Sequence, residues 1–260
     1  MNEIDALQLP GFATPVRRPR RLLTQNSRLK AIGVYNWTLP ALRARLPDGQ
    51  TITTCPAAGV CAAVCYARAG AYTWPSVRQR HLANLAYVVE DLTGWEQAMR
   101  AELRQPRFAR DTWVRVHDSG DFWSDPYTEA WLAIMNASPH VQFYAYTKEV
   151  LRFKRIVEPA RPPNFHWVYS LGGKEDTELN PAVDRVADVF PTEEAIHAAG
   201  WHSQKDDDRL AVLGPAPVGM SANNLKTQKR RQGNRTLGEW QASLRRRRSS
   251  VRWPLPAKDP

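Results

Sequence analysis

The sequence predicts an α/β protein built on a partial (β/α) TIM-like barrel of about six parallel strands. From residue 112 onward, short segments rich in β-branched and aromatic residues alternate with helical patterns, which is the arrangement of βαβ units in a parallel sheet. About six such segments are too few for the eight strands of a full barrel. A chain of 260 residues is long enough to bury the core of one such domain.

The predicted elements follow each other in a regular order. Residues 31–37 form the first strand, and a long helix after Pro75, striped by apolar residues at three- and four-residue steps, continues past Gly94. The later strands are predicted at 112–117, 141–146, 165–170, 185–190 and 210–213. The helices between them are predicted at 126–136, 149–158 and 191–200, the first capped by Ser124 or Asp125.

Composition divides the chain into three parts. Residues 1–30 are a basic arm rich in Pro and Arg, residues 31–225 are the barrel, and residues 226–260 are a basic tail with a helix from Leu237 to Val251. The net charge of +10 comes from the flanks, because residues 17–30 carry +6 and residues 226–248 carry +8. Such flanks can bind the phosphates of a nucleic acid or nucleotide, or they can simply form a solvated surface.

The sequence also indicates where the protein works. No run of about 18 apolar residues is present, so we expect no membrane span. The first residues lack a basic segment followed by an apolar one, so we expect no secretion. A cytoplasmic location suits the three unpaired cysteines, because the cytoplasm keeps thiols reduced.

All three cysteines of the chain lie within one short segment, Cys55 to Cys65, with Pro56 and Gly59 between them. An odd number cannot close as internal disulfides, and thiolates gathered in this way indicate a metal or a cluster. A [4Fe-4S] cluster on Cys55, Cys61 and Cys65 would leave one iron open to substrate. The alternative is a zinc ion, which needs a fourth ligand such as His81.

A second set of polar residues follows the predicted strands, where parallel α/β folds collect their chemistry. Asp118, Ser119, Gly120 and Asp121 follow the strand at 112–117, and Lys148 follows the strand at 141–146. Asp118, Asp121 and Lys148 are the candidate catalytic residues. A helix-capping loop and a solvated lysine are the structural alternatives.

Several further residues have two readings. His117 could be a general acid or base, or a hydrogen-bonded structural residue. The run Asp206 to Asp208 predicts a solvated loop, since adjacent acids do not easily converge on one ion. Aromatic side chains that could cover a cofactor are Trp74 and Trp123. Polar residues that could face the site from the end of the chain are Asn223, Asn224, Lys226 and Gln228.

Motifs spread over residues 28–175 resemble the phage "gene product 88" family. They are Asn36-Trp-Thr-Leu-Pro40, the cysteine segment from Thr54 to Ala67, Arg115 with His117 to Phe122, Tyr127, Trp131, and Phe143-Tyr-Ala-Tyr-Thr-Lys148. This resemblance implies a phage or mobile-element protein. More distantly, the layout resembles radical S-adenosylmethionine enzymes, which carry a three-cysteine loop after the first strand and a Gly/acid turn after the second.

The distant resemblance implies specific roles. The three cysteines would ligate the cluster, and its open iron would bind the amino and carboxylate groups of S-adenosylmethionine. Tyr66 and Ser170 would help bind this cofactor, and the turn Ser119-Gly120-Asp121 would receive its ammonium. Such an enzyme also needs an electron donor.

This sequence departs from the radical-enzyme signature in its spacing. The gaps between its cysteines are five and three residues, whereas the signature has three and two, and Tyr66 follows the last cysteine instead of preceding it. The turn has one Gly and an Asp where the signature has two Gly and a Glu. Two alternatives therefore stay open: a cluster enzyme whose open iron acts as a Lewis acid without S-adenosylmethionine, and a non-enzymatic zinc protein that binds nucleic acid.

Overall fold

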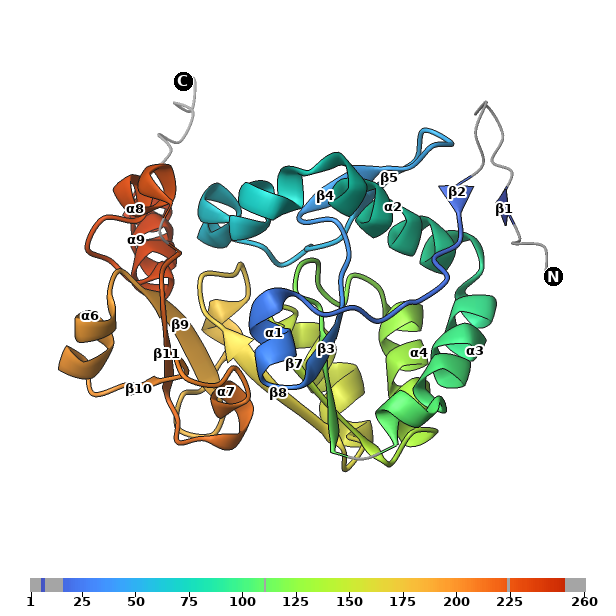
Figure 1. Ribbon diagram of the computed structural model, residues 1–260. Coiled ribbons are helices and arrows are strands. Elements are labelled where there is room, and N and C mark those ends of the chain that lie inside the picture. Colours follow the sequence, from blue (N-terminus) through green and yellow to red (C-terminus); the bar gives the residue numbers. More distant parts are fainter. Residues whose placement is uncertain (1–5, 8–15, 110, 224, 251–260) are drawn as a thin grey trace, which may run out of the picture.

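A computed structural model describes residues 6–7, 16–109, 111–223 and 225–250 of the chain. Its centre is a seven-stranded sheet in which every neighbouring pair is parallel (Figure 1). The strands are β3 (Val34–Trp37), β6 (Thr112–Val116), β7 (Val141–Thr147), β8 (Phe165–Ser170), β9 (Val186–Phe190), β10 (His202–Ser203) and β11 (Val218–Ser221). Their order across the sheet is β10-β11-β9-β8-β7-β6-β3.

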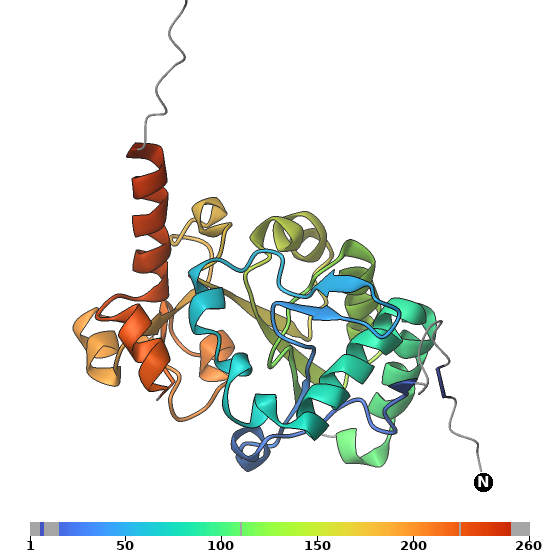
Figure 2. The same ribbon diagram turned by 90° about the horizontal axis from the view of Figure 1, so that it is seen from above.

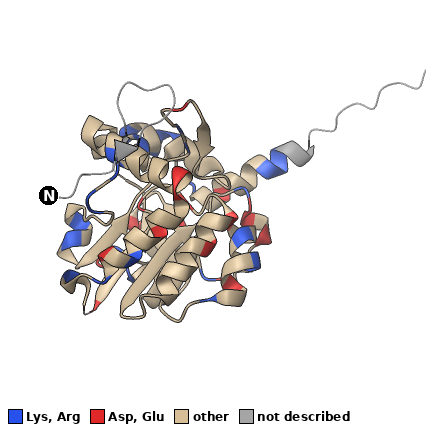
Figure 3. Cartoon of the chain, turned by 90° about the vertical axis from the view of Figure 1, so that its right-hand side faces the viewer, with Lys and Arg blue, Asp and Glu red and all other residues tan. Residues whose placement is uncertain are grey.

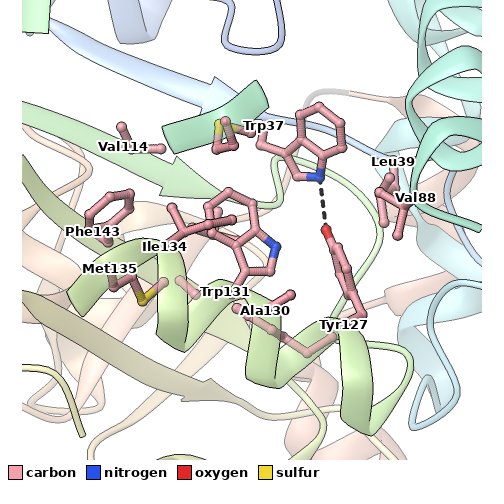
Figure 4. Close-up of a cluster of buried hydrophobic side chains, with 14 of the residues drawn as sticks. Trp37, Leu39, Val88, Val114, Tyr127, Ala130, Trp131, Ile134, Met135 and Phe143 are labelled. Atoms are coloured by element: carbon pink, nitrogen blue, oxygen red, sulfur yellow. Dashed lines mark hydrogen bonds between the residues drawn. The ribbon is translucent and has the colours of Figure 1, made fainter. Parts of the chain in front are cut away.

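One face of the sheet carries the larger core. It is covered by α2 (Pro75–Glu90), α3 (Leu92–Leu103), α4 (Asp125–Asn136) and a helical segment that starts as α5 (Val150–Arg152) and continues to Ala160. Alternate strand residues such as Val114 and Phe143 meet Trp131 and other helix side chains there (Figure 4). The indole of Trp37 donates a 2.8 Å hydrogen bond to the Tyr127 hydroxyl, so the one polar pair in this view is satisfied.

The opposite face carries a smaller apolar cluster. Leu29 on α1 (Ser27–Ala31) and Ala211 on α7 (Leu210–Leu213) pack there against strand residues that include Val34, Tyr144 and Val168. Near the end of the sheet, α6 (Glu193–Ala198) packs on β9, β10 and β11. Both faces of the sheet are therefore covered, as parallel sheets require.

The two ends of the chain pack against distant parts of the molecule. Residues 16–30 begin with β2 (Val16–Arg17), which pairs with β1 (Ala6–Leu7), and continue along the α2–α3 layer, where the backbone of Leu22 and Leu23 donates to Glu102. Helices α8 (Lys226–Gln232) and α9 (Leu237–Ser250) stand together at one side of the molecule (Figures 1 and 2). The arginines of α9 lie toward its end (Figure 3). A small hairpin, β4 (Arg43–Arg45) and β5 (Thr51–Thr53), precedes the cysteine segment.

The structure corrects two of the fold expectations. The sheet has seven strands where the sequence predicts about six, and within the described residues β3 and β10 are edge strands, so the sheet is open. Residues 210–213, predicted as a strand, form α7. A four-residue apolar run is compatible with either structure. Here the Gly214 amide bonds the Leu210 carbonyl at 2.9 Å and so completes a helical turn.

The other elements lie close to their predicted positions. The C-terminal helix is present from Leu237 to Ser250, and the predicted last residue, Val251, lies outside the described part of the chain. None of the helices in the described ranges is long and apolar enough to cross a membrane.

Candidate functional site

A cavity of about 400 Å³ lies at the carboxyl ends of the parallel strands. Its size is in the range of small-molecule sites, and its position is the one where open α/β sheets bind their ligands. The three cysteines, the candidate catalytic residues and the residues expected to bind S-adenosylmethionine all line this one cavity. These residues are Cys55, Cys61, Cys65, Tyr66, Asp118, Ser119, Gly120, Asp121, Lys148 and Ser170.

The three cysteines sit half-buried on one wall of the cavity. They are free thiols on a segment of short 3-10 helices, η1 (Val60–Val64), η2 (Tyr66–Arg68) and η3 (Gly70–Thr73), which carries the chain from β5 to α2. Within the described ranges, no three Cys, His, Asp or Glu side chains are grouped closely enough to hold a single metal ion. The thiols thus share a cavity without converging on one point.

Backbone contacts fix the first half of the cysteine segment. The Ala57 amide donates to the Glu149 carboxylate at 2.7 Å, and the Cys61 amide donates to the Gly172 carbonyl at 3.3 Å. Gly59 is required here, because a Cβ at this position would lie 2.6 Å from the Gly172 carbonyl oxygen. The loops after β7 and β8 therefore set the position of the thiols.

The C-terminal helices fix the rest of the cysteine segment. Gln241 of α9 accepts a 2.9 Å hydrogen bond from the Val60 amide. On α8, Gln228 donates to the Cys65 carbonyl at 3.0 Å, and Arg231 donates to the Ala63 carbonyl at 2.9 Å. The part of the chain predicted as a basic tail is thus a structural support of the cysteine segment.

Lys148 supplies a positive charge beside the thiols. Its ammonium donates to the carbonyl and hydroxyl oxygens of Ser170, both at 2.7 Å, and to the Leu171 carbonyl at 2.8 Å. Burial raises the pKa of all three thiols, and the charge of Lys148 partly counteracts this rise at Cys61 and Cys65. Lys148 is therefore a fixed part of the cavity wall and not the solvated residue of the structural alternative.

Asp121 is held by three donors. The amide of Phe122 at 2.9 Å and the hydroxyl of Thr147 at 2.8 Å bond one carboxylate oxygen, and the amide of Lys148 at 3.0 Å bonds the other. Burial raises the pKa of Asp121 despite these contacts. The preceding residue, Gly120, has a φ of +83°, and a Cβ there would lie 2.7 Å from the Leu39 side chain. The turn is thus tightly set, and the oxygen that bonds only Lys148 keeps acceptor capacity.

A buried ionic cluster also lines the cavity. The sequence does not predict most of its members as site residues. Arg115 lies 3.1 Å from Asp208 and 3.5 Å from Asp118. Tyr144 and Tyr146 donate to the Asp208 carboxylate at 2.6 and 3.1 Å. Asp208 is 4% exposed, so the predicted solvated loop at 206–208 is wrong for this residue.

Asp118 joins this ionic cluster to the cysteine segment and to the N-terminal arm. One carboxylate oxygen accepts from the hydroxyl of Tyr72 and from the side-chain amide of Asn26 at 3.2 Å. Its backbone carbonyl accepts from the hydroxyl of Tyr66. Arg115 on β6 pairs with Tyr144 on β7. Tyr146, two residues further along β7, faces the same side of the sheet and contacts Arg115 through its ring. A charged residue inside a strand, flanked by tyrosines on the next strand, is the sequence signal that could have revealed this cluster.

The structure also places the residues that had two readings. His117 is buried against Phe122 and lies 2.8 Å from the Tyr127 hydroxyl, and burial lowers its pKa to about 3, which favours the structural reading. His81 packs 5.8 Å from the Tyr72 ring, outside the set that lines the cavity.

The two tryptophans proposed to cover a cofactor do not line the cavity. Trp74 is 61% exposed, and Trp123 packs against the core. Asn223 and Gln228 line the cavity, whereas Lys226 does not. Asn224 lies outside the described residues.

The donor set fits an iron–sulfur cluster in its chemistry. Thiolates are the preferred ligands of such clusters, and three buried thiols need a positive charge to hold their deprotonated form. The same cavity is also lined by Arg115, Asp118 and Asp208 of the ionic cluster.

Together, the sheet and the cavity define a parallel α/β protein with a cavity at the carboxyl ends of its strands, beside a three-cysteine segment. The chain belongs to the phage Gene product 88 family, whose family model matches residues 16–253. The chain is similar to the Gene 88 protein of Mycobacterium phage L5, with 27% identity over 114 residues. That match covers 40% of this chain and 46% of the phage L5 protein. No solved structure matches the chain.

Proposed function

We propose that the protein is an iron–sulfur enzyme that holds a [4Fe-4S] cluster on Cys55, Cys61 and Cys65 and binds S-adenosylmethionine beside it. One observation carries this proposal: the three thiols share a cavity with the turn Ser119-Gly120-Asp121 at the carboxyl ends of the strands. When bound, the cluster would supply single electrons and an open iron for amino and carboxylate groups. An electron donor would have to reduce it.

The residues of the chain would position these groups. Lys148 places its charge near Cys61 and Cys65 and favours their thiolate form. The carboxylate oxygen of Asp121 that bonds only the Lys148 amide can accept a hydrogen bond from the ammonium of S-adenosylmethionine. The contacts from Glu149 and Gln241 hold the cysteine segment in place.

Reductive cleavage of S-adenosylmethionine tests this proposal. The protein, reconstituted with iron and sulfide without oxygen and reduced with dithionite, should convert S-adenosylmethionine to methionine and 5′-deoxyadenosine. Its EPR spectrum should change when S-adenosylmethionine is added. Asp121→Asn should lower cleavage at least tenfold while the iron content stays constant. The one oxygen of Asn can keep the bonds from Phe122 and Thr147, but Asn has no negative charge and places an amide group where Oδ2 would receive the ammonium. Glu129→Gln, on the exposed side of α4, is the matched control.

An iron-loaded protein that neither cleaves S-adenosylmethionine nor changes its spectrum would contradict the S-adenosylmethionine part of the proposal. The cluster would then have to act as a Lewis acid on another ligand.

A further inference from the structure

The segment that leads from the cavity-lining residues Tyr66 and Tyr72 into α2 carries an exposed tryptophan and two exposed arginines. Trp74, which is 61% exposed, precedes α2 by one residue, and Arg78 lies one helical turn further on, with its amide bonded to the Trp74 carbonyl at 2.9 Å. Arg68 lies between Tyr66 and Tyr72, both of which line the cavity. We call Arg28, Arg68, Trp74 and Arg78 the rim.

Arg28 belongs to the rim although it is distant in sequence. It lines the cavity from α1, and the preceding Asn26 bonds the same oxygen of Asp118 as Tyr72 does. The start of α1 and the segment before α2 therefore meet at one carboxylate. The guanidinium of Arg28 contacts only the side chain of Gln204 and the carbonyl of Lys205.

The arginines of the rim are not paired with acidic side chains. In the part of the chain that the structure describes, Arg28, Arg68 and Arg78 are exposed and form no ion pair. From residue 6 to residue 89, the sequence holds 11 Lys and Arg but a single acid, Asp48. Other arginines of this stretch have structural roles, such as Arg18, which pairs with Asp91 at 2.9 Å. The rim arginines keep their charge available for a ligand.

We propose that the rim binds single-stranded nucleic acid and presents one nucleotide to the cavity. Free arginines can contact the phosphates, and an exposed indole can stack on an unpaired base, which is how sequence-tolerant single-strand binders work. A duplex offers no unstacked base to Trp74. Helix α8, whose Gln228 lines the cavity, adds the exposed Lys226, Lys229 and Arg230. Binding of the strand does not depend on the proposed function. Only the idea that the bound strand is the substrate rests on it.

Binding of a fluorescein-labelled 20-nucleotide DNA strand of mixed sequence to the full chain tests the inference by fluorescence anisotropy. Trp74→Ala should weaken binding about tenfold, the size of one base–aromatic contact, and Trp74→Phe should retain most of the affinity. The double variant Arg68→Ala/Arg78→Ala should flatten the slope of log affinity against log salt by about 1.4. Exposed residues away from the cavity provide controls: Val183→Ala and Arg104→Ala should leave binding unchanged.

The inference would be overturned by no binding of the strand, by binding that Trp74→Ala leaves unchanged, or by equal competition by a duplex. Competition by polyglutamate as strong as that by unlabelled strand would overturn it in favour of an acidic protein partner.

The iron content of the same preparation separates this inference from the proposed function. Trp74-dependent binding by protein that cannot be loaded with iron would uphold the rim and contradict the cluster. Iron-loaded protein that does not bind the strand would contradict the rim and support the cluster.

Discussion

At the scale of single residues, the site depends on carboxylates buried next to the cysteine segment. Glu149 accepts from the Ala57 amide and pairs with Arg152 at 2.5 Å, yet burial, together with the charge of Asp121, raises its pKa to about 8. The folded protein therefore binds a proton at Glu149 more tightly than the unfolded chain does. The stability that this group contributes is present below about pH 4.5 and is lost as the pH rises toward 8.

We expect Glu149→Gln to flatten the dependence of stability on pH. A neutral glutamine keeps an acceptor for the Ala57 amide but has no proton to lose. Between pH 5 and 8 the wild-type free energy of unfolding should fall by on the order of 1 kcal/mol per pH unit from this group. Urea unfolding at several pH values measures the slope, with Glu129→Gln as the control. An unchanged slope in Glu149→Gln would show that Glu149 ionises normally.

Single residues also show where sequence reasoning stops. The positions of Asp121 and Lys148 at one cavity could be anticipated, because strand ends of a parallel sheet meet at one edge. The partnership of Arg115 with Asp208 could not, since it joins residues 93 positions apart through side chains that local patterns do not relate. Asp208 resembled the exposed Asp206 in sequence, and only the tertiary fold buries it.

At the scale of elements, the last two helices determine the conformation of the cysteine segment. The start of α9 is fixed on the sheet, because the amide of Gly238 donates to both oxygens of Asp188 on β9 at 3.1 Å. From there α9 reaches Val60 through Gln241. The sequence indicated a helix at this position, but its charge pattern suggested an external ligand and did not reveal an internal support.

Replacing Gln241 with alanine should loosen the cysteine segment. The Val60 amide would lose its acceptor in a buried place, at a cost of about 1–3 kcal/mol. We expect a lower urea midpoint and faster reaction of the three thiols with a disulfide reagent. Ser243→Ala on the same helix is the control, because that hydroxyl bonds only the Trp240 carbonyl. Unchanged thiol reactivity in Gln241→Ala would mean that α9 does not hold the segment.

At the scale of the whole molecule, one edge of the sheet collects segments from both ends of the chain. Residues from α1, the cysteine segment, the ends of five strands and α8 line the same cavity. Strong periodicity made the central strands predictable, whereas β10 and β11 are two and four residues long and carry too little pattern to be found. The open edge at β10 likewise depends on tertiary pairing and not on local sequence.

The most direct test of the central claim is the metal content of the chain after anaerobic reconstitution. Iron, sulfide and zinc would be measured in the wild type and in Cys55→Ala, Cys61→Ala and Cys65→Ala, with folding checked by circular dichroism. We expect about four irons and four sulfides per wild-type chain and a large loss in each folded variant. A single zinc in the wild type, or iron that survives all three substitutions, would contradict it.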